Sequence, residues 1–220
     1  MKFEAVLFDC DGVLADSERI TNGVLRDMLG EMGWALSREE CMRIFVGKAV
    51  KDEAALIQAR TGRQLTDDWM MKFRERRNER LMREVQAVPG ALDAVARLHG
   101  LLAGRIACAS GADLPKVRMQ LDKCGFMPFL QGRIFSGHDL ARSKPAPDVY
   151  LAAASAVHVA PQRCLVVEDT VTGVTAGVAA GATVFGYSPR ESGHDTPHAL
   201  RQAGAELIFS HMGDLPELLG

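Results

Sequence analysis

The sequence predicts an α/β protein that contains a Rossmann-like parallel sheet and a separate helical unit. Short apolar runs rich in β-branched residues recur along the chain, and segments with helix start signals separate them. Strands and helices that alternate at this spacing form βαβ crossovers, in which helices cover both faces of a parallel sheet. Residues 17–87 interrupt the alternation, because they contain no strand pattern and indicate several amphipathic helices.

Six segments have the composition of buried strands. They are Phe3–Phe8, Arg105–Ala109, Gly132–Phe135, Cys164–Val167, Thr183–Phe185 and Leu207–Phe209. Helix starts between them are indicated by polar residues or prolines at Asp113, Pro115, Pro147, Asp148 and Pro197. Together these elements predict an α/β core domain formed by residues 1–16 and 88–220. Residues 17–87 are expected to form a helical cap domain, in which Ser37 and Glu40 have the spacing of a capping box.

Composition and charge exclude several classes of protein. The 220 residues are 47% hydrophobic and 25% charged, close to the average of globular chains and unlike disordered or fibrous ones. With 26 basic and 28 acidic residues the net charge is −2, so no overall positive field attracts nucleic acid or an anionic membrane. The basic run from Lys72 to Glu84 is nearly balanced by acidic residues, which favours a solvated helix face over a nucleic-acid surface.

Cysteine usage and hydropathy indicate a cytoplasmic protein without a membrane partner. The five cysteines are scattered and form no C-x-x-C pair, which is typical of a reducing compartment. Residues 170–189 carry no charge, and Gly173, Gly177 and Gly181 have the small-residue spacing of membrane helices. A membrane span needs ~20 mostly apolar residues, whereas this stretch holds four glycines and four threonines. We expect these glycines to let a helix lie close against a sheet.

Two aspartates end the first predicted strand. Asp9 and Asp11 are two residues apart, so in an extended chain both side chains project beyond the same edge, and Gly12 permits a sharp turn. Carboxylates this close repel each other unless a cation or proton lies between them. The alternative is a pair of ordinary turn or capping aspartates.

Three further strand ends carry polar side chains. Ser110-Gly111 follows the second strand, Lys144 follows the third, and Glu168-Asp169 follows the fourth. The carboxyl ends of parallel strands form the ligand-binding edge of such sheets. Carboxylate oxygens suit Mg²⁺, whereas a hydroxyl, free backbone N–H groups and an ammonium suit phosphate. Ser110 alone also fits an ordinary helix cap, but the four strand ends together predict one site.

These motifs resemble those of the haloacid dehalogenase-like hydrolases, in particular the phosphatase and β-phosphoglucomutase branch with a helical cap after the first strand. The motifs occur in the family's order over essentially the whole chain: Asp9-Cys10-Asp11-Gly12-Val13-Leu14, Ser110-Gly111, Lys144-Pro145 and Glu168-Asp169-Thr170. The dehalogenases proper lack an aspartate at position 11, so its presence favours phosphoryl transfer.

The resemblance implies a role for each motif residue. Asp9 is the nucleophile that forms an aspartyl-phosphate, and Asp11 is the general acid and base. Ser110, Gly111 and Lys144 hold the phosphoryl group. Mg²⁺ is bound by Asp9, the backbone carbonyl of Asp11, and Asp169, with Glu168 acting through the metal's water shell.

The cap is expected to select the substrate. The segment from Phe45 to Lys51 resembles the family's specificity loop, where Lys48 and Lys51 would meet an anionic or polyhydroxylated substrate; the alternative is two surface lysines. The mutase pattern has a histidine in the first cap helix, where this chain has Thr21. We therefore expect a phosphatase for a small phosphorylated sugar or sugar acid, similar to the 6-phosphogluconate phosphatase type.

Two alternatives and one expectation about assembly remain. A β-phosphoglucomutase-like mutase is the first alternative. The second is a non-enzymatic phospho-acceptor domain, which also joins aspartates, Mg²⁺, a hydroxyl and a lysine at a sheet edge, but is usually shorter and lacks a helical insertion. The chain is expected to be a monomer or weak dimer.

Overall fold

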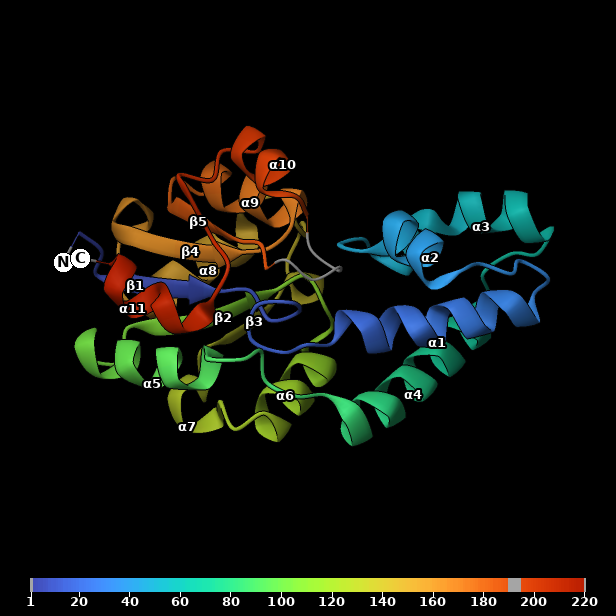
Figure 1. The fold of residues 1–220 in the computed structure, drawn as a ribbon, viewed down its shortest axis with the longest axis horizontal. Helices are drawn as coiled ribbons and strands as arrows, with labels where there is room; N and C mark the ends of the chain where they lie inside the picture. The colour runs from blue at the N-terminus through green and yellow to red at the C-terminus, as the bar shows by residue number, and fades with distance from the viewer. Residues whose placement is uncertain (1, 190–194, 220) are drawn as a thin grey trace. The chain divides into compact units, whose positions relative to one another are not determined.

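The chain folds into two compact units in a computed structural model that describes residues 2–189 and 195–219 (Figure 1). The core unit consists of residues 1–16 and 86–220, and the cap unit consists of residues 17–85. Gln86 and Ala87, which the sequence pattern assigns to the cap, pair with the backbone of Asp16 and Ala15 in the core unit.

The core unit contains a six-stranded parallel sheet, which confirms the predicted fold class. Its strands lie in the order β3-β2-β1-β4-β5-β6 and every neighbouring pair is parallel. Their bounds are β1 Ala5–Phe8, β2 Ile106–Ser110, β3 Ile134–Ser136, β4 Cys164–Glu168, β5 Thr183–Tyr187 and β6 Leu207–Phe209. All six predicted strands are present. Because β1 lies between β2 and β4, the chain leaves the centre of the sheet first toward one edge and then toward the other.

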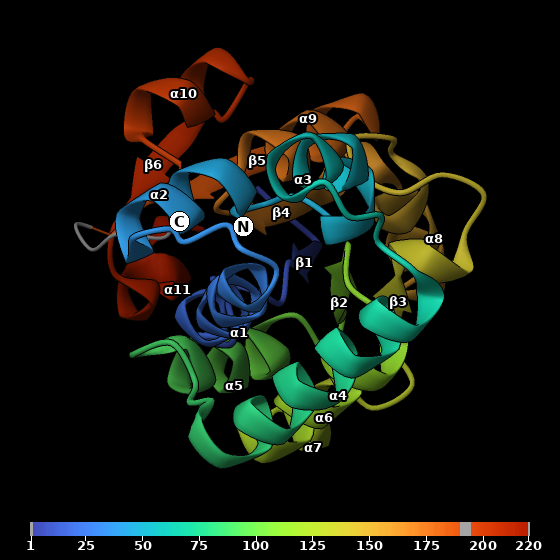
Figure 2. The same ribbon diagram turned by 90° about the vertical axis from the view of Figure 1, so that its right-hand side faces the viewer.

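Helices cover both faces of this sheet (Figures 1 and 2). One face contacts α8 (Asp148–Ala156) and α9 (Val171–Ala179), beside which lies α10 (Pro197–Gln202). The other side holds α5 (Ala91–Leu101), α6 (Leu114–Lys123), α7 (Met127–Leu130) and α11 (Leu215–Leu218). Strands β1, β2 and β4 are buried along their whole length, as two covered faces require. The short 3-10 turns are η2 (Gly137–Asp139), η3 (Pro161–Arg163) and η4 (Met212–Asp214).

The glycines of α9 allow this helix to approach the sheet closely, as the sequence predicts. A Cβ atom at Gly177 would lie 2.8 Å from Cγ2 of Val184 and 3.1 Å from Cγ1 of Val166. A carbon–carbon contact of 2.8 Å does not occur in a packed core, and one of 3.1 Å is already tight, so glycine is the residue that fits at this point. Residues 170–189 therefore form a packed helix and strand β5. Among residues 2–189 and 195–219, none of the helices has both the length and the hydropathy of a membrane span.

The cap unit is helical and has its own core. Its helices are α1 (Glu18–Glu31), α2 (Arg38–Phe45), α3 (Ala54–Thr61) and α4 (Asp67–Glu84), with a 3-10 turn η1 (Val50–Glu53). The predicted capping box is present, since Glu40 N donates to Ser37 Oγ at 3.2 Å and Ser37 N donates to Glu40 Oε2 at 2.8 Å. Apolar side chains from α1 to α4, including Leu29, Ile57 and Phe73, pack together.

Candidate active site

The candidate site lies at the carboxyl ends of the central strands. Asp9 directly follows β1, and its backbone N–H donates to Val167 O in β4 at 3.0 Å. Ser110 is the last residue of β2 and Glu168 is the last residue of β4, followed by Asp169. The strand order reverses direction at β1, which is the point where open parallel sheets bind ligands.

A buried lysine joins these strand ends. Lys144 Nζ donates to Asp9 Oδ1 at 2.6 Å and to Glu168 Oε1 at 2.7 Å. The same ammonium lies 2.9 Å from the carbonyl oxygen of Ala109 and 3.0 Å from the hydroxyl of Tyr150. The Lys144 side chain is only 7% exposed. Four oxygen acceptors around one ammonium therefore fix both the lysine and the side-chain oxygen of Asp9.

Burial and neighbouring charges shift the pKa values of this pair. Burial alone would lower the pKa of Lys144, but the carboxylates of Asp9 and Glu168 outweigh it and raise that pKa well above its usual value. Burial raises the pKa of Asp9 well above its usual value; the charge of Lys144 opposes this shift, and the carboxylates of Glu168, Asp169 and Asp11 add to it. Lys144 is therefore a positive charge in the site, and it stabilises the anionic form of Asp9 against the effects of burial and of the neighbouring carboxylates.

Glu168 is held from both of its oxygens. Oε1 accepts from Lys144, and Oε2 accepts from the backbone N–H of Asp169 at 2.9 Å and of Thr170 at 3.2 Å. The Thr170 hydroxyl donates to the same oxygen at 3.1 Å. A Cβ atom at Gly173, in the first turn of α9, would overlap the Glu168 carboxylate. The glycine therefore leaves the space in which Glu168 lies.

Asp11 has a different set of partners from Asp9. Its Oδ1 accepts from Lys116 Nζ at 2.7 Å and from Gln120 Nε2 at 3.0 Å. Both donors belong to α6 and both are buried. The turn after Asp11 uses Gly12 at a φ of 82°, a left-handed conformation that favours glycine. The two aspartates of the first motif thus belong to one site but have separate cationic partners.

Ser110 and Gly111 lie beside Lys144. Ser110 is fully buried, and its Oγ accepts from the backbone N–H of Ala112 at 3.0 Å. A Cβ atom built on Gly111 would be 4.0 Å from Cδ of Lys144. The Ser110 hydroxyl, the backbone N–H of Gly111 and the Lys144 ammonium therefore lie near one another. These are the kinds of hydrogen-bond donor that suit a phosphoryl group.

The charges of the site suit a divalent cation. Four carboxylates (Asp9, Asp11, Glu168 and Asp169) and the two ammonium groups of Lys116 and Lys144 lie in the site. Within residues 2–189 and 195–219, no group of three or more His, Cys, Asp or Glu side chains is arranged as a metal site. Two carboxylates and a backbone carbonyl, completed by water, are nevertheless the oxygen ligands that Mg²⁺ prefers. Asp9, Asp169 and the backbone carbonyl of Asp11 are oxygen groups of this chemical type.

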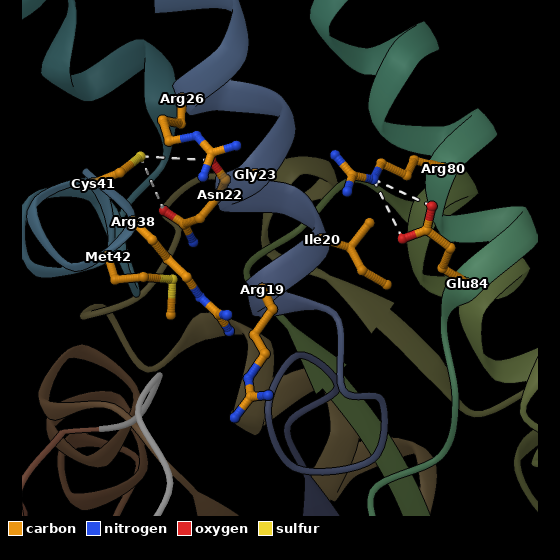
Figure 3. Close-up of a pocket in the computed structure, with 10 residues that line it drawn as sticks. All are labelled: Arg19, Ile20, Asn22, Gly23, Arg26, Arg38, Cys41, Met42, Arg80 and Glu84. Atoms are coloured by element: carbon orange, nitrogen blue, oxygen red, sulfur yellow. Dashed lines mark hydrogen bonds and ion pairs between the residues drawn. The ribbon is translucent and has the colours of Figure 1, made fainter. Parts of the chain in front are cut away.

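The predicted substrate residues of the cap lie at its surface. Lys48 and Lys51 are both exposed, and Lys48 Nζ lies 3.2 Å from Glu53 Oε1. A separate pocket of about 290 Å³ lies within the cap unit between α1, α2 and α4 (Figure 3). The guanidinium groups of Arg19 and Arg38 lie on the same side of it.

This pocket is polar and positively charged. Its lining residues are Arg19, Ile20, Asn22, Gly23, Arg26, Arg38, Cys41, Met42, Arg80 and Glu84. Arg26 forms an ion pair with Asp27 at 2.7 Å, and Arg80 forms one with Glu84 at 3.3 Å. Neither Lys48 nor Lys51 lines the pocket.

Lys116, Gln120, Tyr150 and the arginines of the cap pocket were not predicted from the sequence. For Lys116 and Gln120, the sequence does contain an indication. Lys116 and Gln120 are four residues apart on the same stripe of α6 as the buried Val117 and Leu121. Two polar side chains on the apolar stripe of a helix need buried partners, and Asp11 is the partner of both.

Comparison with known proteins assigns a family to this arrangement. A family model described as haloacid dehalogenase-like hydrolase matches residues 3–181. The 6-phosphogluconate phosphatase of Escherichia coli (strain K12) is 30% identical over 218 residues, which cover 99% of this chain and 95% of that protein.

Solved structures of similar proteins belong to the same family. A conserved haloacid dehalogenase-like protein of unknown function from Agrobacterium tumefaciens is 33% identical with a TM-score of 0.84, covering 99% of this chain and 97% of that one. A hydrolase of the same family from Deinococcus radiodurans, solved with bound phosphate and sodium, is 31% identical with a TM-score of 0.80. The alignment covers 99% of this chain and 95% of that one.

The position of Glu168 generates a prediction about Gly173. In Gly173→Ala the new Cβ displaces the Glu168 carboxylate and with it Lys144, so we expect phosphatase kcat/KM to fall by about 10- to 100-fold. The matched control is Gly100→Ala, since nothing lies within 4 Å of a Cβ at that helical glycine. Steady-state kinetics and thermal unfolding of both variants check this. Equal activity in the two variants would show that catalysis does not require the observed position of the Glu168 carboxylate.

Proposed function

The chain belongs to the haloacid dehalogenase-like hydrolases, and from this premise we propose that it is a Mg²⁺-dependent phosphatase for small phosphorylated metabolites that works through an aspartyl-phosphate. The observation that carries the proposal is the contact of Lys144 with Asp9 at 2.6 Å, at a buried strand end flanked by Ser110 and Gly111. A carboxylate oriented by an ammonium, next to a phosphate-type donor set, suits nucleophilic attack on phosphorus.

In the first half of the reaction, an oxygen of Asp9 attacks the phosphorus and the bond to the leaving oxygen breaks. Asp11 gives a proton to that leaving oxygen, which departs as an alcohol. Lys144, the Ser110 hydroxyl and the backbone N–H of Gly111 bind the phosphoryl oxygens and offset their developing charge. In the second half, Asp11 takes a proton from water as the water attacks phosphorus, and the bond to Asp9 breaks to release phosphate.

Mg²⁺ would be held by the carboxylates of Asp9 and Asp169 and the backbone carbonyl of Asp11, with Glu168 near its water shell. When bound, the ion offsets the repulsion between the attacking carboxylate and the phosphate dianion. The carboxylates of Glu168, Asp169 and Asp11 around Asp9 support this assignment, because a cation among them would favour the anionic form of Asp9 that a nucleophile needs.

A sugar phosphate or sugar-acid phosphate is the substrate class that we propose. The support comes from the Escherichia coli relative, which is a 6-phosphogluconate phosphatase and aligns over nearly the whole of both chains. Within the cap, Lys48 and Lys51 and the arginine-lined pocket supply positive charge that suits a polyhydroxylated or acidic substrate. We further propose a cytoplasmic protein that is a monomer or a weak dimer.

A phosphatase is preferred over a mutase because of position 21. The mutase pattern has a histidine at this position, whereas the hydroxyl of Thr21 is buried and has no hydrogen-bond partner among the described residues. A threonine hydroxyl has neither the charge nor the reach of an imidazole. The phospho-acceptor alternative is not favoured, since the family of the chain is one of hydrolases.

We predict that Asp9→Asn abolishes Mg²⁺-dependent release of phosphate from 4-nitrophenyl phosphate. An amide is neither an effective nucleophile nor an anionic ligand, so turnover should fall by more than about 10³-fold. The matched control is Asp122→Asn, an exposed position on α6, which should leave turnover unchanged. An Asp9→Asn protein that keeps a few per cent of the wild-type rate, with contamination excluded, would contradict the proposal.

We also predict hydrolysis without isomerisation of a hexose phosphate. The protein is incubated with β-glucose 1-phosphate, Mg²⁺ and a trace of glucose 1,6-bisphosphate, and glucose 6-phosphate and free phosphate are followed together. Without a histidine at position 21 to restrain Asp11, water should be the acceptor and free phosphate should exceed glucose 6-phosphate. Conversion to glucose 6-phosphate far in excess of phosphate release would contradict the phosphatase assignment and support the mutase alternative.

A further inference from the structure

The side chain of Asp11 accepts hydrogen bonds from two side chains of one helix, α6. Oδ1 of Asp11 lies 2.7 Å from Lys116 Nζ and 3.0 Å from Gln120 Nε2, although the chain positions are 105 and 109 residues apart. The Lys116 and Asp11 side chains are only 6% and 15% exposed, and Gln120 is fully buried. A buried, charge-assisted contact with a second donor on the same oxygen fixes the plane of the carboxylate.

The N-terminus of α6 fixes the direction of these donors. Asp113 is the N-cap of the helix, and its Oδ1 accepts from the backbone N–H of Lys116 at 3.1 Å. Lys116 and Gln120 are four residues apart, so they lie one above the other on the same helix face. The helix therefore presents an ammonium and an amide to the same point.

Stability of the core does not account for Gln120. Its Oε1 atom is buried and accepts no hydrogen bond from any of the described residues. A buried polar atom without a partner destabilises a fold, and leucine at this position would fill the same apolar stripe without that cost. Among residues 2–189 and 195–219, the Gln120 side chain makes one hydrogen bond, and Asp11 is its partner.

We propose that Lys116 and Gln120 are positioning residues for the acid and base steps of Asp11, an inference that rests on the proposed phosphatase function. Their side-chain nitrogens bind Asp11, and none of the hydrogen bonds found among the described residues joins them to Asp9. By occupying Oδ1 they leave the exchanged proton to Oδ2, because an oxygen that accepts from both an ammonium and an amide is a poor site for a proton. The proton passes from Oδ2 to the leaving oxygen as its bond to phosphorus breaks, and Oδ2 regains a proton from the attacking water.

The test uses Lys116→Met, which keeps an unbranched side chain one atom shorter than lysine but removes the charge. Phenyl phosphate and 4-nitrophenyl phosphate serve as probes, since they are similar in size but phenol, with a pKa of ~10 like that of tyrosine, needs a proton on leaving far more than nitrophenol does. We expect kcat/KM for phenyl phosphate to fall about tenfold more than kcat/KM for 4-nitrophenyl phosphate. Gln120→Leu should also lower kcat/KM for phenyl phosphate more than kcat/KM for 4-nitrophenyl phosphate, but by a smaller factor. Lys116→Arg keeps a cationic donor, so its kcat/KM for phenyl phosphate should lie between those of Lys116→Met and the wild type.

Two controls separate positioning from a structural role. Lys123→Met, at an exposed position in the last turn of α6, should leave both kcat/KM values unchanged. In an Asp11→Asn background, Lys116→Met should change the phenyl phosphate value by less than about twofold, since residues that act through one group are not additive. Equal losses on both probes, or full additivity with Asp11→Asn, would overturn the proposal.

The Asp11→Asn variant alone distinguishes the two proposals. If Asp11→Asn loses more kcat/KM on phenyl phosphate than on 4-nitrophenyl phosphate, and Lys116→Met loses the same on both, then Asp11 is the acid and the positioning role is wrong. If Asp11→Asn itself treats the two probes alike, the assignment of Asp11 as the general acid fails. The positioning role then fails with it. Unchanged thermal unfolding of Lys116→Met and Gln120→Leu shows that the comparison is made on folded protein.

Discussion

The ion pair between the buried ammonium of Lys144 and the carboxylate of Asp9 is the interaction on which the site depends. A buried charge is tolerated only when it is paired and hydrogen-bonded, and removing one partner of such a pair costs about 3–5 kcal/mol. Lys144 meets this requirement with contacts to Asp9, Glu168, Ala109 and Tyr150. The ends of β1, β2 and β4 are therefore tied to one point, and the geometry of the nucleophile follows from the packing of the sheet.

The sheet topology explains how residues far apart in the chain meet at this point. Strands β1, β2 and β4 are adjacent and parallel, so the residues that follow them share one edge. Gly177 lets α9 pack closely against β4 and β5, and Gly173 leaves room for the Glu168 carboxylate at that edge. The inserted helices pack around apolar side chains of their own. The insertion can therefore vary in sequence without disturbing the strands that carry the catalytic groups.

Much of the fold could be predicted because local patterns determine it. The β-branched runs predict all six strands, Ser37 and Glu40 predict the start of α2, and the small residues of α9 predict its close packing. The clustering of the motif residues at one edge could be predicted for the same reason, since each lies at or beyond the carboxyl end of a strand that the pattern reveals.

Contacts between distant helices and strands could not be predicted in this way. Nothing near Asp11 indicates that Lys116 is its partner, because the two meet only when α6 packs beside the sheet. Tyr150 has an apolar ring that fits the core of α8, and its hydroxyl gains a role only through Lys144 and Glu168. The cap arginines belong to three helices whose relative arrangement the sequence does not specify.

The central claim, that Asp9 becomes covalently phosphorylated, is tested most directly by trapping the intermediate. Wild-type protein and Asp11→Asn are mixed with acetyl phosphate and Mg²⁺, quenched in acid within the first turnover, reduced with borohydride and mapped by peptide mass spectrometry. Acetate leaves without a proton, so Asp9 should be phosphorylated in both, and the modification should accumulate in Asp11→Asn because water is not activated. Reductive modification at residue 9 is the predicted result. Modification at another residue, or none in either protein while phosphate is being released, would contradict the account.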